Sequence, residues 1–218
     1  MNFSVPGAGP FNRERPMPKA GQQTQFQKSE NTRQRLIRAA VEMIAEVGYA
    51  AATTTLISQR AGVTRGAFQH HFRSKNEVML AILNEMSERV NVGLEAEPLA
   101  ALPLDQRIDA LLDHYYRAYG TKLHFAAIQI WLNALRDPEL RRSVHFGLNM
   151  VDRAILDAWR ATFPETDLDD RKLMAVRRVI ISAIRGSTIH DMWSNEKDNS
   201  AHDLAVLKGF LKLHLAGH

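Results

Sequence analysis

The sequence contains no cysteine, and this absence excludes several kinds of chemistry. Without cysteine there can be no disulfide, no thiolate ligand for a metal ion and no cysteine nucleophile. Nothing in the chain indicates an oxidising compartment, so a cytoplasmic location is expected. Long apolar runs are missing as well. The segment 179–184 is interrupted by a serine and followed by Arg185, far short of the roughly 20 residues that a membrane span needs.

Acidic residues are scarce in the N-terminal third of the chain. Residues 1–76 contain eleven lysines and arginines against four glutamates, a net charge of +7, whereas residues 77–218 hold 17 basic and 20 acidic residues, a net charge of −3. Such an asymmetry indicates that the N-terminal part meets a polyanion. A basic face that is simply solvated would give the same pattern, and charge alone does not separate the two interpretations.

Strand-like alternation of apolar and polar residues is missing beyond Ser29, and every periodic segment has the helical period. The sequence therefore predicts an all-α fold of about nine helices. Residues 1–28 are rich in proline, glycine, glutamine and asparagine, and we expect them to form a flexible basic arm. Start and stop signals place the helices at about 31–47, 54–61, 65–72, from 75 into the second domain, 104–119, 125–135, 138–163, 167–193 and 200–215.

Residues 54–73 have the proportions of a helix-turn-helix, in which two short helices are joined by a turn of three or four residues containing glycine. Gly62 can adopt the left-handed conformation that a sharp turn demands. Phe68 and Phe72, four residues apart, are expected to anchor the second helix. The residues left on its free face are Thr64, Arg65, Gly66, Gln69 and His70. These groups are short or rich in hydrogen-bond donors, and can approach base edges in the major groove.

Lys75 opens the following helix, whose exposed amides and positive dipole end favour a phosphate group. The sequence thus divides into a basic arm (1–28), a three-helix helix-turn-helix domain that binds DNA (29–76) and a C-terminal helical bundle for effector binding and dimerisation (77–218).

One segment resembles the signature of the TetR (tetracycline repressor) family. It is AGVTRGAFQHHFRSKNEVML, residues 61–80, and the resemblance continues upstream through Gly48-Tyr49 and Thr53-Thr54 to cover about residues 31–83. Gln69 departs from the pattern, since the family usually has a phosphate-contacting tyrosine there, and Ser58 stands where alanine is commonest. The resemblance implies a dimeric regulator, usually a repressor, whose C-terminal domain binds a small molecule that lowers operator affinity.

The motif and the resemblance together assign contacts with double-stranded operator DNA. His70 and His71 are adjacent and so cannot share a helical face as metal ligands, and His71 is interpreted as a phosphate contact or a partly buried support. No metal ion or other cofactor is expected. The predicted DNA-binding residues are Thr53, Thr54, Thr64, Arg65, Gly66, Gln69, His70, His71 and Lys75.

Aromatic residues and methionines concentrate in the second domain, where most must form the core. A subset of them, with a few polar groups, is expected to line a pocket for a small-molecule effector of unknown identity. The candidates are Tyr115, Tyr119, Gln129, Trp131, Asn133, His145, Asn149, Trp159, His190 and Trp193.

The last two predicted helices carry apolar stripes that would suit a four-helix interface between two subunits. The same stripes could instead close the core of the monomer, and the family resemblance favours the interface. The stripes are Leu173, Val176, Ile180, Ala183, Ile184 and Ser187, and then Leu204, Leu207, Leu211 and Leu215.

These observations favour a DNA-binding transcriptional regulator, a repressor released from its operator by a small molecule, and not an enzyme. An all-α enzyme with histidine bases is disfavoured, because there is no HExxH-like pattern, no paired Glu-x-x-His pattern and no phosphate loop. An architectural DNA-binding protein without an effector is the other alternative. An enclosed cavity in the second domain would distinguish the two DNA-binding functions.

Overall fold

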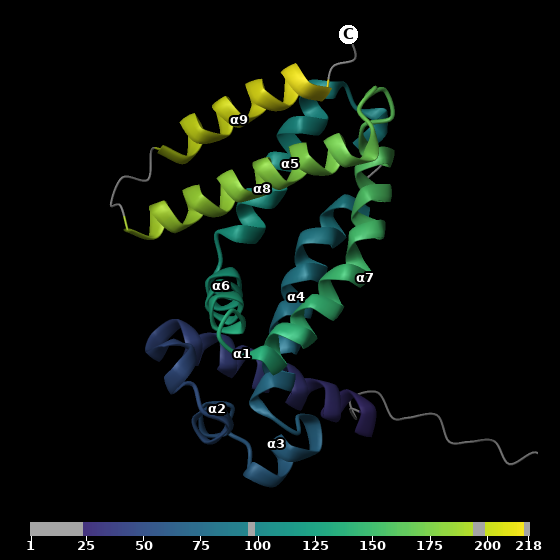
Figure 1. Cartoon of the computed structure of the whole chain (residues 1–218). Coiled ribbons are helices and arrows are strands. Elements are labelled where there is room, and N and C mark those ends of the chain that lie inside the picture. Colours follow the sequence, from purple (N-terminus) through teal and green to yellow (C-terminus); the bar gives the residue numbers. More distant parts are fainter. Residues whose placement is uncertain (1–23, 96–98, 194–198, 216–218) are drawn as a thin grey trace, which may run out of the picture.

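The computed structural model describes residues 24–95, 99–193 and 199–215, and this part of the chain forms helices and no strand. The prediction of an all-α fold is confirmed. Figure 1 shows the arrangement. The elements are α1 (Gln25–Ala51), α2 (Thr54–Arg60), α3 (Arg65–His71), α4 (Lys75–Glu95), the 3-10 helix η1 (Leu99–Ala101), α5 (Leu104–Tyr119), α6 (Lys122–Ala134), α7 (Pro138–Thr162), α8 (Asp170–Trp193) and α9 (Asn199–Leu215).

The start of α1 lies earlier than the sequence predicted. Thr24 and Gln27 form a reciprocal capping box, in which the Thr24 hydroxyl accepts from the Gln27 N–H at 3.2 Å and the Gln27 side chain accepts from the Thr24 N–H at 2.8 Å. Residue 31, the expected start, lies inside the helix, where the nearby Gln34 side chain donates to Glu30. Residues 25–28, assigned to the arm, are therefore helical, while residues 1–23 lie outside the described part.

Most other helix ends lie where the sequence placed them. Thr53, Thr64 and Asp137 cap α2, α3 and α7 through their side-chain oxygens, and Pro138 occupies the first turn of α7. Gly48 interrupts the end of α1 with φ of +83° and ψ of 164°, a backbone conformation that favours glycine. Local signals were sufficient at these positions because each cap is made within a few residues of the chain.

One further start needed correction. α6 begins at Lys122 rather than at Phe125, because the Thr121 hydroxyl accepts from the His124 N–H and caps the helix. α4 begins at Lys75, as predicted. The Glu77 N–H donates to the Ser74 hydroxyl, and the Glu77 carboxylate accepts from the Arg73 N–H at 2.7 Å.

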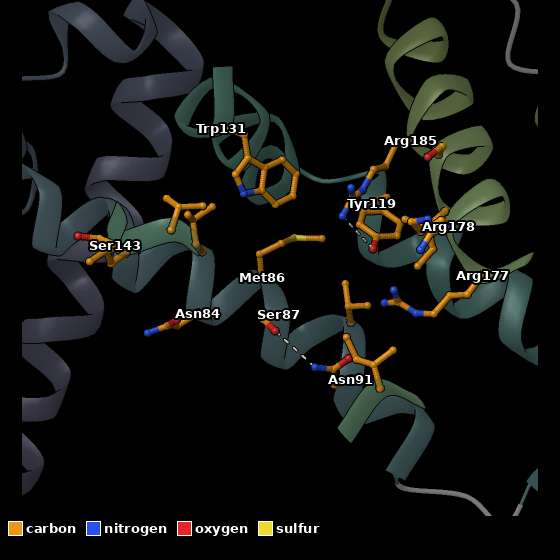
Figure 2. A pocket seen from close by; sticks show the side chains of 17 residues that line it. Asn84, Met86, Ser87, Asn91, Tyr119, Trp131, Ser143, Arg177, Arg178 and Arg185 are labelled. Atoms are coloured by element: carbon orange, nitrogen blue, oxygen red, sulfur yellow. Dashed lines mark hydrogen bonds between the residues drawn. The ribbon is translucent and has the colours of Figure 1, made fainter. Parts of the chain in front are cut away.

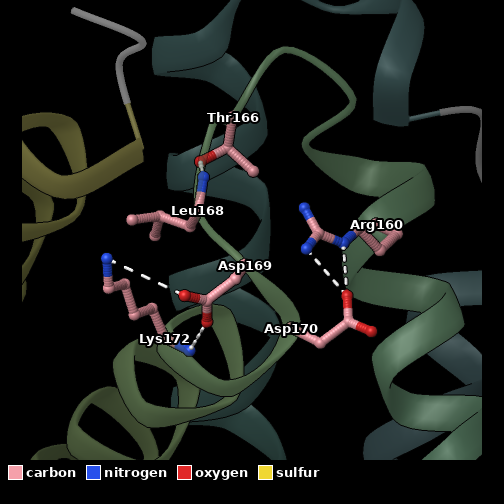
Figure 3. Close-up of polar contacts among 6 residues, drawn as sticks. All are labelled: Arg160, Thr166, Leu168, Asp169, Asp170 and Lys172. Carbon is pink, nitrogen blue, oxygen red and sulfur yellow. Dashed lines mark hydrogen bonds and ion pairs between the residues drawn. The ribbon is translucent and has the colours of Figure 1, made fainter.

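α8 begins later than the sequence predicted, at Asp170 and not at residue 167. Figure 3 shows that Asp169, not Asp167, accepts from the Lys172 N–H, at 2.8 Å. This backbone hydrogen bond, with the nearby Lys172 ammonium, lowers the pKa of Asp169. Asp170 forms an ion pair with Arg160 of α7 at 2.7 Å. The turn between α7 and α8 is thus held by charge on both sides.

The helices share one apolar core that runs from α1 into the C-terminal helices, residues 77–218, which the sequence predicted to form the second domain. Figure 1 shows α1, α2 and α3 together at one end and α4 leading from them toward the remaining helices. α6 packs against α1, and α4 packs against both α6 and α7. Within the second domain Trp159 donates its indole N–H to the buried hydroxyl of Tyr115 at 3.0 Å. No helix of the described residues is both long and apolar enough to cross a membrane.

The predicted interface stripes of α8 and α9 face the interior of the monomer, and the assignment needs correction. Leu173, Ile180 and Ile184 of α8 and Leu211 and Leu215 of α9 are all fully buried within the single chain. The alternative that the sequence left open, closure of the monomer core, is what these residues do. They are buried because α8 and α9 pack against each other and against α5.

A different set of apolar residues lies on the outer surface of the same two helices. Val179 of α8 is 53% exposed, and Val206 and Leu213 of α9 are 72% and 71% exposed. Gly186 and Gly209 have no atom within 4 Å of the position that a side chain would occupy. This outer face is available to another molecule.

Candidate nucleic-acid interface and ligand cavity

The turn between α2 and α3 has the geometry of a helix-turn-helix. Gly62 takes φ of +63°, and Arg35 of α1 donates to the carbonyl oxygens of Ala61 and Gly62. These hydrogen bonds fix the turn against the first helix. A side chain at Gly62 would lie 3.1 Å from the Arg35 guanidinium. Both the left-handed backbone and the close guanidinium therefore favour glycine here.

α3 buries one face and leaves the other to solvent. Phe68 and Phe72 are each 3% exposed and their ring centroids lie 6.0 Å apart. Arg33 of α1 lies 5.4 Å from the centroid of the Phe72 ring and covers it. The exposed residues are Thr64, Arg65, Gly66, Gln69 and His70, the set that the sequence assigned to the free face.

The charge around this free face is positive. The sequence has no acidic residue between Glu46 and Glu77. Arg60 of α2 is neutralised by ion pairs with two glutamates of α1, whereas Arg65 makes no ion pair within the described residues. An exposed guanidinium at the start of a short helix, in a segment without acids, suits a polyanion.

The two histidines at the end of α3 differ in their surroundings. His70 is exposed and His71 is half-buried, and their rings meet edge to face with centroids 5.1 Å apart. Burial, together with the charges of His70 and Arg33, lowers the pKa of His71. Of the two predicted roles of His71, partial burial is observed, and its contact with a phosphate stays a prediction.

Thr53 and Thr54, two further predicted contacts, stand at the start of α2. The Thr53 hydroxyl accepts from the Leu56 N–H, so it is engaged in capping the helix. The Thr54 carbonyl accepts from the Ser58 hydroxyl at 2.7 Å. Ser58 is buried, and this hydrogen bond satisfies its polar group at the helix crossing.

Lys75 connects α4 with the end of α1. Its ammonium donates to the Tyr49 carbonyl oxygen and lies 4.1 Å from the centroid of the Tyr49 ring. Burial lowers the pKa of Lys75. An ammonium has three donors, so the bond to Tyr49 leaves donors for a phosphate.

Gln129 of α6 also contacts the end of α1, through two hydrogen bonds. Its amide oxygen accepts from the Tyr49 N–H at 2.9 Å, and its amide nitrogen donates to the Ile44 carbonyl at 3.1 Å. Tyr49 is therefore bonded to both Lys75 and Gln129. One side chain of the second domain thus reaches the backbone that supports a predicted DNA contact.

The second domain contains a cavity of about 330 Å³. α4 supplies one wall with Leu83 and Met86 among others, while Trp131 comes from α6 and Tyr119 from the end of α5. Figure 2 shows Arg177, Arg178 and Arg185 on one side of this cavity, all from α8, with Met86 and Trp131 reaching in from other helices. The cavity is thus apolar over much of its wall and cationic on one side.

The N-terminal helices match the model of a known family. Residues 36–82 match the family described as bacterial regulatory proteins, tetR family. Over 186 residues the chain is 31% identical to the HTH-type transcriptional regulator BetI of Vibrio atlanticus, and the match covers 83% of this chain and 90% of the relative. This chain belongs to the TetR family.

Other comparisons agree with membership of the TetR family. The HTH-type transcriptional regulator CymR of Pseudomonas putida is 26% identical over 175 residues, which cover 80% of this chain and 86% of that protein. The solved structure of Salmonella enterica GusR has a TM-score of 0.65 at 22% identity, covering 85% of this chain and 95% of that one. The likeness to GusR supports the TetR fold.

Only some of the predicted ligand-binding residues of this TetR-family chain line the cavity. Tyr119 and Trp131 line it. Tyr115 and Trp159 do not: both are fully buried and hydrogen-bonded to each other in the core. Their large side chains fill the interior between α5 and α7 instead of enclosing space.

The polar candidates are placed elsewhere. Gln129 faces the end of α1 and not the cavity, Asn133 donates to the Gln129 carbonyl within its own helix, and His190 is exposed. Both of these α6 side chains are hydrogen-bonded to backbone groups. The remaining candidates, whose side chains lie outside the described residues, are His145, Asn149 and Trp193.

Sequence reasoning missed the arginines of α8. Arg177 and Arg185 lie four residues to either side of Ile181, which is buried, so all three share one helical face. A charged residue that recurs on an otherwise apolar face is the signal that could have identified them.

Proposed function

We propose that this TetR-family protein is a homodimeric DNA-binding repressor that leaves its operator when a small molecule occupies the cavity of the second domain. One observation carries the proposal. α4 begins at Lys75, beside the helix-turn-helix, and further along supplies Leu83 and Met86 to the cavity wall. A ligand that displaces this wall necessarily acts on the helix that follows the recognition helix. The family membership supplies the class of function.

DNA recognition is assigned to the exposed face of α3. Arg65 stands at its first turn, and a guanidinium there can pair with O6 and N7 of guanine in the major groove. Lys75 and His71 flank this face and are suited to phosphates, which set affinity without sequence preference. No catalytic role is proposed for any residue.

The dimer is assigned to the outer face of α8 and α9. Val179, Val206 and Leu213 would be buried there, and the open glycines Gly186 and Gly209 let two helices approach closely. The variant Val206→Glu should give a 24.6 kDa monomer in sedimentation, because a buried carboxylate without a partner opposes association. The equivalent change at an exposed leucine outside this face, Leu135→Glu, should leave the dimer intact. A monomer in the unmodified protein would contradict the assignment.

DNA binding is tested by selecting operator sequences from random duplexes and measuring the affinity of each variant for them over a salt series. Arg65→Ala should lose preference at one base position in each half-site, a contact worth ~1–3 kcal/mol. Lys75→Ala should weaken all duplexes about equally and reduce the salt slope by about 1 per half-site. If Arg65→Ala weakens every duplex equally while its base preferences survive, α3 is not the element that reads sequence.

The architectural alternative, a DNA-binding protein without an effector, is disfavoured by the cavity. A core that served only to hold two DNA-binding domains together would gain stability from filling such a space.

A further inference from the structure

The cavity has an unusual balance of charge. Arg177, Arg178 and Arg185 all line it from α8, and none of its described lining residues is an aspartate or glutamate. Arg177 and Arg185 are partly buried, whereas Arg178 is exposed. Guanidinium groups around one small cavity repel one another, and removing those of Arg177 and Arg185 from water costs free energy. A wall of this kind is unfavourable for the empty protein and favourable for an anion.

Arg185 is held in place by aromatic rings and not by an acid. Its guanidinium carbon lies 4.9 Å from the centroid of the Tyr119 ring and 4.7 Å from that of Trp131. Its one hydrogen bond to a side chain within the described residues is a long one, 3.4 Å, to the Tyr119 hydroxyl. The rings orient the guanidinium but leave its charge unneutralised.

Donors of these arginines are also unused. The Nε atoms of Arg177 and Arg185 are buried and have no hydrogen-bond partner among the described residues. Leaving a charged donor unsatisfied in this way is costly unless a ligand provides the acceptor.

His124 packs against Tyr119 of the cavity wall, edge to face, with 4.7 Å between the ring centroids. Burial lowers its pKa to about 4, so it is neutral at pH 7.

Most of the remaining wall is apolar. Met86 and Val90 of α4 and Trp131 of α6 contribute to it, beside the uncharged polar groups Asn84, Ser87 and Asn91 of α4. The volume of about 330 Å³ is at the lower end of the roughly 300–1,000 Å³ usual for ligand sites, so a molecule of modest size fits. The planar forks of arginine match a carboxylate, whose two oxygens can accept two donors at once.

We propose that the effector is a small amphipathic monocarboxylate, whose carboxylate pairs with Arg177 and Arg185 and whose apolar body lies against Met86 and Trp131. This inference rests on the proposed function, since it names the ligand of the same cavity. It also concerns a property of the cavity that can be measured without DNA.

The experiment uses calorimetry on the full-length protein with ligands that share a chain and differ in charge. Hexanoate, octanoate and 4-butylbenzoate are the acids, and octanol and octylamine are the matched neutral and cationic compounds. We expect at least one acid to bind saturably, octanol to bind at least tenfold more weakly than octanoate, and octylamine not to bind. Equal binding of octanol and octanoate, or the absence of saturable binding by every acid, would overturn the proposal.

Substitutions on one helix locate the site. Arg177→Met and Arg185→Met keep the apolar stem and should each weaken binding of the acid at least tenfold, whereas Arg185→Lys should retain part of the affinity. Arg171→Met removes an exposed charge from the first turn of the same helix and should leave binding unchanged. Unchanged binding in both Arg177→Met and Arg185→Met refutes the assignment. If a methionine variant fails to fold, the charge-matched ligands on the unmodified protein decide.

Operator release is measured separately. An acid that binds by calorimetry and lowers operator affinity supports both proposals. An acid that binds but leaves the operator complex intact supports the carboxylate site and contradicts the effector role. If the protein binds no duplex above its affinity for random DNA, the proposed function fails while the calorimetric result on the cavity stands.

Discussion

Replacing Gln129 is the most direct test of the contact between α1 and α6. The variant Gln129→Leu has a side chain of similar size but neither hydrogen bond. It leaves the Tyr49 N–H and the Ile44 carbonyl, which lie at the end of α1, without their side-chain partner. A neutral hydrogen bond contributes about 0.5–1.5 kcal/mol, and a buried group left unsatisfied costs about 1–3 kcal/mol. Because Tyr49 is only half-buried, water can partly replace the lost hydrogen-bond partner of its N–H. We expect the free energy of unfolding to fall by about 1–3 kcal/mol.

The same change should also affect function. The Tyr49 carbonyl is the acceptor for Lys75, so a looser end of α1 should weaken operator binding. Trp131 lies two residues from Gln129 on α6 and lines the cavity, so the variant should also respond less to an effector, because the coupling free energy between the sites falls.

Urea unfolding and operator titration with and without ligand measure both effects. Gln129→Glu keeps the acceptor for Tyr49 and loses the donor to Ile44, and should give an intermediate result. The control is Asn133→Leu on the same helix, where the Asn133 side chain donates to the Gln129 carbonyl within α6. If Gln129→Leu matches the unmodified protein in stability, operator affinity and ligand response, the contact between α1 and α6 does not depend on these hydrogen bonds.

Three further predictions concern stability. Since burial lowers the pKa of His124 to about 4, below its unfolded value of about 6.5, the protein should lose ~1.4 kcal/mol of stability per pH unit as the pH falls from about 6.5 toward 4. His124→Phe should lose less stability on acidification, measured as the difference between the urea unfolding midpoints at pH 7 and pH 5. His190→Gln, a change at the surface, should behave like the unmodified chain. Gly62→Ala should lower stability by about 1–2 kcal/mol in thermal unfolding, because φ is +63°. Arg107 is buried and forms a bidentate ion pair with Glu165. Arg107→Met should therefore destabilise the protein by about 2–3 kcal/mol, and an NMR titration should find the lowered pKa of Glu165 back near its ordinary value.

The sequence by itself determined the fold class and the helix-turn-helix, because the interactions that specify them are local. Thr53 and Thr64 cap helices within three residues of themselves. Gly62 marks a turn by its own backbone freedom, and Phe68 and Phe72 meet across one turn of a helix. Such contacts need no information about distant parts of the chain.

Only the tertiary structure decided which helical faces meet. The stripe containing Leu173, Ile180 and Ile184 has the spacing of either a core or an interface, and its burial in the monomer follows from the packing of α8 against α5 and α9. Gln129 likewise is a residue type that suits a pocket, but the contact between α6 and α1 brings it to the backbone of Tyr49 and Ile44, 80 and 85 residues away in sequence. Arg177 and Arg185 line a cavity because four other helices leave space beside α8. The periodicity of one helix does not predict that space.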